Sequence, residues 1–206
     1  MKPLKVVAVS AGLSQPSSTR LLADRLADAV RRRLAEEREV EVRVVELRDL
    51  ATDIAKNLVT GFPGPALREA IEAVTEADGL IAVTPIFTAS YSGLFKSFFD
   101  VIEDDKLIGK PVLIAATGGT ARHSLALEHA LRPMFVYLRS IVVPTSVYAA
   151  SEDWGGGGDS RTDGLAVRID RAAGELADLM VHRSPAAPAA DEVVVPFAEQ
   201  LAALRP

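Results

Sequence analysis

Short apolar runs recur along the chain and alternate with longer stretches in which apolar residues follow a helical spacing. Short runs rich in β-branched side chains are typical of buried strands. The predicted strands are residues 4–10, 40–47, 79–83, 110–116 and 141–148. The predicted helices are residues 20–37, 66–77, 92–103, 121–138 and 164–183. Residues 48–65 have weak periodicity and several Gly and Pro, so a loop with a helical turn is expected there.

Regular alternation of strands and helices predicts a parallel sheet with helices on both faces. No G-x-G-x-x-G pattern follows the first strand. We therefore expect an α/β fold: a flavodoxin-like three-layer sandwich whose parallel five-stranded sheet has the order 2-1-3-4-5. This domain spans residues 1–183, and residues 184–206 form a Pro/Ala-rich linker and a C-terminal tail. In that order the loops after the first and third strands meet at one crevice, where such folds bind ligands.

The loop after the first strand is dense in hydroxyl groups. It offers the hydroxyls of Ser10, Ser14, Ser17, Ser18 and Thr19, and it ends where a helix begins. Free amides and the positive end of a helix dipole favour an anion, so this loop can hold a phosphate. It lacks the G-x-x-x-x-G-K-[ST] pattern, which favours a phosphate monoester over ATP. The alternative is simple helix capping with surplus serines.

The loops after the third and fourth predicted strands complete the crevice. The first of them carries Phe87 and Tyr91, against which a planar ligand can lie, and Thr88 and Ser90, whose hydroxyls can reach the ligand's edge. The second contains Gly118 and Gly119, where a ligand can approach the backbone closely. Phosphate at one end, a flat ring at the other and glycine amides alongside describe a flavin mononucleotide site. The alternative for the aromatic loop is an ordinary strand-to-helix turn with two core aromatics.

Composition and charge narrow the function classes. The chain has 206 residues, 49% of them hydrophobic, and a formal net charge of -5. Mild acidity argues against nucleic acid as a partner, because phosphate backbones require clustered Lys and Arg. Cysteine is absent, which excludes disulfides, thiol catalysis and thiolate metal sites. The apolar stretch at residues 4–9 is too short for a signal or a membrane span, so a soluble cytoplasmic protein is expected.

Three motifs carry a resemblance to a known family. They are the segments 10–19 (SAGLSQPSST), 84–93 (TPIFTASYSG) and 116–123 (ATGGTARH), each at a predicted strand end. With them the chain resembles the NAD(P)H-dependent FMN reductases of the flavodoxin-like fold over about residues 4–150. It looks closest to the alkanesulfonate-type reductases that supply reduced flavin to two-component monooxygenases. The implied activity is reduction of FMN by NADPH or NADH, with release of FMNH2 to a partner monooxygenase.

The resemblance also implies roles for individual residues. The implied neighbours of the FMN phosphate are Ser10, Ser17, Ser18 and Thr19. The implied lining of the flavin ring is Pro85, Ile86, Phe87 and Thr88. The implied border between flavin and nicotinamide is Thr117, Gly118, Gly119 and Thr120. Hydride passes directly between the cofactors, so no catalytic acid–base pair is expected.

The chain also departs from the family pattern. Many relatives carry an arginine near Ser14, and its absence leaves the choice between NADPH and NADH open; Arg20 is the candidate substitute. Many have a tyrosine where Phe87 stands. In some relatives an aromatic at the position of His129 lies in a distorted helix at a tetramer interface, so His129 is either such a residue or a packed histidine. His123, Glu128 and His129 do not have metal-ligand spacing, and no metal is expected.

Two other functions remain open at this stage. One is an enzyme that keeps its FMN and reduces quinones, azo dyes or metal oxyanions. The other is a flavodoxin-like electron carrier, which the modest charge disfavours, since carriers usually dock through a strongly acidic face. A homodimer or homotetramer is expected, because the apolar positions Phe95, Phe98, Phe99 and Phe135 exceed what one sheet face needs. The tail segment 193–197 is a candidate strap across a neighbouring subunit.

Overall fold

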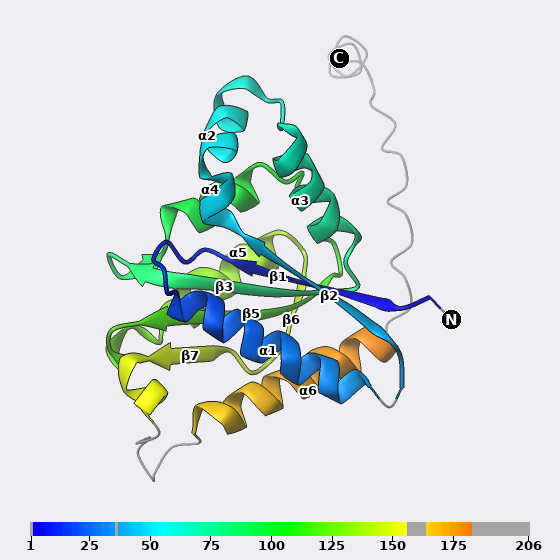
Figure 1. Ribbon diagram of the computed structural model, residues 1–206, viewed down its shortest axis with the longest axis vertical. Coiled ribbons are helices and arrows are strands. Elements are labelled where there is room, and N and C mark those ends of the chain that lie inside the picture. Colours follow the sequence, from blue (N-terminus) through cyan, green and yellow to red (C-terminus); the bar gives the residue numbers. More distant parts are fainter. Residues whose placement is uncertain (1, 36, 156–163, 183–206) are drawn as a thin grey trace, which may run out of the picture.

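The computed structural model describes residues 2–35, 37–155 and 164–182 (Figure 1). The predicted linker and tail (184–206), including the segment 193–197, lie outside these ranges, as do residues 156–163. Within the described ranges, none of the helices is both long enough and apolar enough to cross a membrane.

A mostly parallel sheet forms the middle layer. Its main path has the order β2-β1-β3-β5-β6, so the predicted 2-1-3-4-5 order is confirmed. The strands on this path are β1 (Leu4–Ser10), β2 (Val40–Glu46), β3 (Gly79–Phe87), β5 (Pro111–Gly118) and β6 (Ile141–Val142). Two shorter strands pair off this path: β4 (Ser90–Tyr91) with β3, antiparallel, and β7 (Val147–Ala150) with β5, parallel.

The described part of the chain therefore has seven strands rather than the predicted five. The last predicted strand, 141–148, is divided. β6 pairs with the start of β5, β7 pairs with its end, and Pro144 lies in the interruption, where it has no N–H to donate to a ladder. The other added strand arises because β3 continues past Val83 to Phe87 and turns back on itself as a hairpin.

Helices cover both faces of the sheet (Figure 1). α1 (Ser18–Leu34) and α6 (Leu165–His182) pack on one face. α2 (Ala51–Thr60), α3 (Pro65–Glu76), α4 (Gly93–Asp100) and α5 (Arg132–Tyr137) pack on the other. Alternate residues of β1 belong to the two cores: Val7 and Val9 face α2–α5, and Val6 and Ala8 face α1 and α6. This alternation is what a strand buried on both sides requires, and it gives the predicted three layers.

The prediction of a loop over residues 48–65 was wrong. A 3-10 turn (Leu47–Leu50) leads into α2, whose Ile54 and Asn57 are buried. Gly61 ends α2 with a left-handed φ of 75°, and Pro65 begins α3 at a position where no N–H is needed. The Gly and Pro residues that suggested a loop thus mark the end of one short helix and the start of the next.

The predicted helix over residues 121–138 is irregular at its start. A 3-10 turn (Ala121–His123) is followed by a π-helical turn (Leu127–Leu131) and then by α5. Pro133 lies in the first turn of α5, where a missing N–H is tolerated. The π-helical turn runs directly into α5, so the chain stays helical through Pro133.

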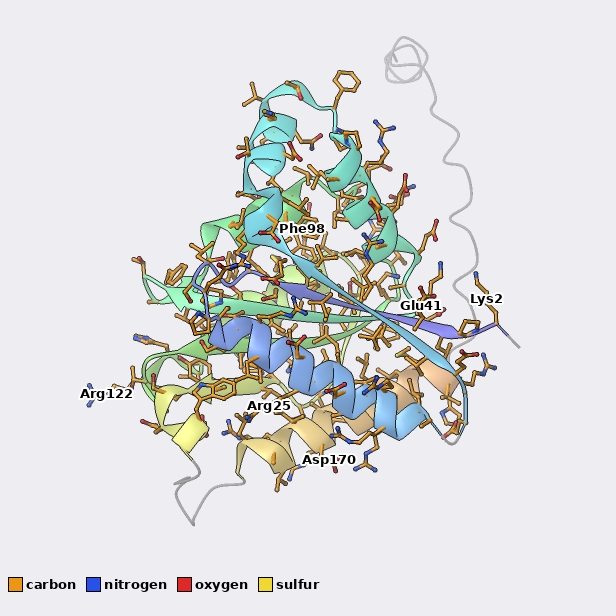
Figure 2. All side chains as sticks on the ribbon, in the orientation of Figure 1. Lys2, Arg25, Glu41, Phe98, Arg122 and Asp170 are labelled. Atoms are coloured by element: carbon orange, nitrogen blue, oxygen red, sulfur yellow. The ribbon has the colours of Figure 1, made fainter. Side chains whose placement is uncertain are left out.

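The aromatic stripe expected to be surplus is inside the core. Phe95, Phe98 and Phe135 are fully buried, and Phe99 is nearly so. Their rings pack together, with centroids 4.9 Å apart for Phe95–Phe99 and 5.0 Å apart for Phe99–Phe135. Phe98 lies between the helices and the sheet (Figure 2). The argument that this stripe indicates oligomerisation was therefore wrong. The phenylalanines of α4 and α5 pack against one another and against the sheet, inside the subunit.

Candidate functional site

A cleft of about 430 Å³ lies at the carboxyl ends of β1, β3 and β5. This volume is within the roughly 300–1,000 Å³ range of small-molecule sites. The strand register brings the loops together, since Ser10 pairs with Val83 and Pro85 pairs with Thr117. The lining residues are Leu13, Ser14, Ser18, Thr19, Pro85, Ile86, Phe87, Thr117, Gly118, Gly119, Ser151 and Trp154.

The start of α1 forms one side of the cleft. Ser17 is the N-cap, and its hydroxyl accepts a hydrogen bond from the Arg20 amide at 3.2 Å. Ser18 and Thr19 follow at the cleft itself, and the buried Thr19 and Thr117 hydroxyls hydrogen-bond at 2.8 Å. This bond joins the loop after β1 to the end of β5. The helix start thereby presents hydroxyls and unpaired first-turn amides to the cleft, a combination that favours an anion.

The hairpin of β3 and β4 forms a second wall. Its base is fixed by the fully buried Thr84, whose hydroxyl accepts from the Ser92 amide and donates to the Pro85 carbonyl, both at 3.0 Å. Thr88 and Ala89 make the turn with φ of 49° and 65°. Residues other than glycine rarely adopt a positive φ. Here the positive φ values match the backbone twist that a two-residue hairpin turn requires. The turn leaves Phe87 46% exposed at the cleft.

The end of β5 forms the floor. A Cβ added to Gly118 would overlap the Tyr148 hydroxyl and lie 3.1 Å from its Cζ. That hydroxyl donates to the Thr120 carbonyl at 2.9 Å. Burial, with a smaller contribution from Glu152, raises the pKa of Tyr148, so the phenol stays protonated as this bond requires. Glycine is therefore needed at position 118 by close packing and not by an unusual φ.

A fourth segment, which the sequence analysis did not assign to the site, also reaches the cleft. Residues 151–155 form a 3-10 turn after β7, and Ser151 and Trp154 both line the cleft. The indole also packs against the core under α1 and α6. The Arg25 guanidinium of α1 lies 5.0 Å from its ring centroid, and Figure 2 shows Arg25 on that side of α1. The sequence feature that could have indicated this part of the site is a tryptophan that follows closely after the end of a predicted strand.

The predicted site residues separate into two groups. Those that line the cleft are Ser18, Thr19, Pro85, Ile86, Phe87, Thr117, Gly118 and Gly119. Those that do not are Ser10, Ser17, Thr88, Tyr91 and Thr120. Most of the second group are supports: Ser10 is only 1% exposed in β1, Ser17 and Thr120 cap helical turns, and Thr88 shapes the hairpin. The sequence interpretation missed Leu13, Ser151 and Trp154, and it named Ser14 only as one of the hydroxyls of the first loop.

Two arginines near the first loop form ion pairs with carboxylates of this chain. Arg20 pairs with Asp24 at 2.8 Å and with Glu46, and the hydrogen bond to Asp24 is the main cause of its raised pKa. Its suggested role as a substitute phosphate ligand is thus in competition with two internal partners. Arg48 lies 3.3 Å from Glu46 and donates to the Ser14 carbonyl at 3.4 Å, so it holds the loop rather than the cleft.

A second cavity, of about 400 Å³, lies between α4 and the π-helical turn. Tyr91 lines this cavity together with His129, Met134 and Tyr137. Tyr91 and Phe87 therefore line different cavities. The expectation that both contact one planar ligand finds no counterpart in this arrangement.

The neighbouring Glu128 is bound internally. It pairs with Arg132 at 2.6 Å and accepts from the Ser146 hydroxyl at 2.8 Å. The bond from Arg132, with a smaller contribution from Ser146, holds the pKa of Glu128 below its ordinary value. Within the described ranges, no group of three or more His, Cys, Asp or Glu side chains is arranged to hold a metal ion.

Comparison with known sequences identifies relatives that cover most of the chain. A family profile described as "NADPH-dependent FMN reductase" matches residues 4–155. An "FMN reductase (NADPH)" of Pseudomonas aeruginosa is 38% identical over 185 residues, covering 88% of this chain and 95% of the relative. The "NADH-dependent FMN reductase SfnE" of Pseudomonas putida is 38% identical over 173 residues, covering 83% of this chain and 89% of the relative.

Solved structures are similar over the same region. An oxidoreductase from Corynebacterium diphtheriae is 45% identical with a TM-score of 0.84, covering 89% of this chain and 100% of that one. The apo form of the NADH:FMN oxidoreductase EMOB is 31% identical with a TM-score of 0.73, covering 90% and 92%. A WrbA-like flavodoxin from Agrobacterium tumefaciens, 15% identical with a TM-score of 0.60, shares the fold.

Proposed function

This chain belongs to the family of NADPH-dependent FMN reductases, and we propose that it reduces FMN with NAD(P)H in the cleft at the ends of β1, β3 and β5. The observation that carries the proposal is the convergence of three loops, far apart in sequence, on one cleft of about 430 Å³. That cleft provides an anion-binding helix start, an apolar wall and a glycine floor.

The start of α1 is the proposed phosphate end. Ser18 offers its hydroxyl there, beside the first-turn amides and the positive end of the helix dipole, whereas the hydroxyl of the neighbouring Thr19 is bonded to Thr117. The charge of Arg20 is taken up by Asp24 and Glu46. The phosphate is thus held chiefly by neutral donors. A Cβ at Gly12 would overlap the Ser17 hydroxyl, so the loop is packed tightly around the helix start that serves this end.

The β3–β4 hairpin is the proposed wall for the flavin ring. Pro85, Ile86 and the half-exposed Phe87 give an apolar surface, and the Thr84–Ser92 bond keeps the hairpin in place. Gly118 and Gly119 allow the ring to approach the β5 backbone. Tyr91 is not part of this wall, because it lines the other cavity.

When bound, the flavin supplies the hydride-accepting centre and the nicotinamide supplies the hydride. The residues of the cleft bind the two rings, orient them and exclude water. Their apolar, hydroxyl and glycine groups suit this work, since it depends on shape and hydrogen bonding. The Thr19–Thr117 bond keeps the phosphate end and the ring end of the cleft at a constant separation.

The test is NADH and NADPH oxidation by the purified protein with and without added FMN. We expect turnover that depends on FMN with at least one coenzyme. The variant Phe87→Ala should weaken FMN binding, whereas Phe62→Ala, an 80%-exposed phenylalanine outside the cleft lining, should not. Absence of flavin-dependent turnover with both coenzymes would refute the proposal.

The fate of the product is a further part of the proposal. We expect FMNH2 to leave for a partner flavin-dependent monooxygenase, because Phe87, on the proposed wall for the flavin ring, is 46% exposed. Tight flavin co-purification with ping-pong kinetics toward quinones, azo dyes or metal oxyanions would instead support the enzyme that retains its flavin. The preference between NADPH and NADH is decided by the same coenzyme assays.

Self-association as a homodimer or homotetramer is also proposed. The supporting observation is the exposed apolar surface of Val136 and Tyr137, 59% and 76% exposed, beside the π-helical turn that carries His129. Light scattering measures the assembly mass. Tyr137→Glu should reduce that mass if this surface is the interface, and deletion of residues 185–206 tests the tail separately. An unchanged mass in Tyr137→Glu would exclude this surface.

A further inference from the structure

The turn that carries Trp154 is fastened at several points. Asp153 accepts from the Ala150 amide at 2.8 Å and pairs with Arg168 at 2.6 Å. Arg168 in turn donates to the Tyr148 carbonyl at 2.6 Å. These bonds tie residues 151–155 to β7 and to α6, so the indole is held by rigid elements rather than by a free loop.

The indole is also held from one side by a cation. The Arg25 guanidinium, on the exposed face of α1, lies over the ring at 5.0 Å from the centroid. A cation within about 6 Å of the ring centroid is attracted by the ring's electrons. Trp154 is only partly buried and borders the cleft, so part of its surface remains available to a ligand. A ring oriented in advance loses little conformational entropy on binding.

We propose that Trp154 is a stacking platform for a flat heteroaromatic ring of a nucleotide bound in the cleft. The inference rests on the proposed function, which brings two nucleotides, FMN and NAD(P)H, to this site. Their rings are the ligand chemistry that an aromatic face recognises. Phe87 and Trp154 reach the cleft from separate segments, the β3–β4 hairpin and the turn after β7. The cleft thus has an aromatic surface on each of two walls for the two nucleotides.

A purely structural tryptophan makes a different prediction. If Trp154 only fills space against the α1–α6 core, its replacement lowers stability and leaves affinity unchanged. If it stacks on a ligand, a flat ring at position 154 preserves affinity and an aliphatic side chain does not. Loss of one base–aromatic stack weakens binding by roughly 5- to 150-fold.

The experiment compares Trp154→Leu, Trp154→Phe and the wild type, with Phe62→Leu as the matched exposed control. Each protein is freed of bound flavin and titrated separately with FMN, NADH and NADPH, and KM and kcat are measured. Folding is checked by circular dichroism and thermal unfolding. We expect Trp154→Leu to weaken at least one ligand roughly tenfold or more, while Trp154→Phe and Phe62→Leu stay near wild type.

The FMN titration and the coenzyme measurements together identify which ring stacks on Trp154. Weaker FMN binding assigns the platform to the flavin, and a raised KM for coenzyme with little change in kcat assigns it to the coenzyme. If Trp154→Leu folds and binds all three ligands as the wild type does, the platform is refuted even though the enzyme remains active. If the wild type itself binds neither FMN nor coenzyme, the proposed function fails and this inference with it.

Arg25 supplies an independent check as a positioning residue, because it lies outside the cleft lining. Arg25→Gln removes the cation from the ring and should weaken the same ligand by a smaller factor. In the Trp154→Leu background the same change should have no further effect on affinity. Equal effects in both backgrounds would show that Arg25 does not act through the indole, which would overturn its part in the platform.

Discussion

Gly118 and Tyr148 provide a sharp test of the packing beneath the cleft. A methyl group at position 118 would overlap the Tyr148 hydroxyl and lie 3.1 Å from Cζ. The ring must move to admit it, and its hydrogen bond to the Thr120 carbonyl, 2.9 Å long, is then lost. Gly118→Ala therefore combines overpacking with the loss of one partly buried hydrogen bond.

The expected cost follows from these two contributions. Overpacking of a well-filled interior costs about 1–3 kcal/mol, and a lost hydrogen bond costs about 0.5–1.5 kcal/mol. We expect Gly118→Ala to lower the free energy of unfolding by about 3 kcal/mol, or Tm by roughly 6–12 °C for a domain of this size. Gly119→Ala is the matched control, because a Cβ there has nothing within 4 Å; its effect should stay within about 0.5 kcal/mol.

Urea unfolding of the flavin-free protein measures both variants without a contribution from ligand binding. A double-mutant cycle with Tyr148→Phe then tests the cause. Tyr148→Phe alone should cost about 1 kcal/mol, and in its presence Gly118→Ala should become cheaper by about 2 kcal/mol. If the two costs simply add, the hydroxyl is not the obstacle and the steric explanation for Gly118 is wrong.

Three further predictions concern the supports of the site. Thr19→Val should cost about 1–3 kcal/mol in urea unfolding by leaving the buried Thr117 hydroxyl unpaired, and Thr19→Val/Thr117→Val should cost less than the sum of the single changes. Ser92→Ala should cost about 1 kcal/mol by removing the N-cap of α4, while Ser92→Gly should cost only about a few tenths. Glu128 has a lowered pKa through Arg132, so its stabilisation is present above its ordinary pKa of 4.5 and is lost as pH falls through the lowered value. Unfolding of wild type and Glu128→Gln across that pH range should therefore converge on acidification; a constant difference would contradict the pairing.

Local pattern was enough for much of the framework. The apolar runs at 4–10 and 110–116 became β1 and β5 with little change, because a strand buried on both faces must be apolar throughout. The strand order followed from alternation and handedness, which leave few arrangements of such elements. A serine cap at the start of α1 was also readable, since capping depends only on residues within one turn; the structure assigns it to Ser17.

The periodicity of apolar residues in the sequence predicts that a side chain is buried, but it does not predict which other element covers that side chain. The stripe of Phe95, Phe98 and Phe99 was readable as apolar, but only the packing of α4 against α5 showed that it is internal. Similarly, the segment 48–65 contains short helices whose identity depends on Ile54 and Asn57 being buried by neighbours. Burial of this kind is set by elements distant in the chain.

By itself, the sequence determined the layered α/β fold, its strand order and the three motifs that converge on the cleft. Only the tertiary structure decided which residues of those motifs face it. The hairpin turn at Thr88 and Ala89 separates Phe87 from Tyr91 into different cavities, and the turn after β7 brings in Trp154. The physical reason is the sequence separation of the interactions involved. Strand and helix preferences depend on a few neighbouring residues, whereas a site forms where backbone segments far apart in sequence come within contact distance.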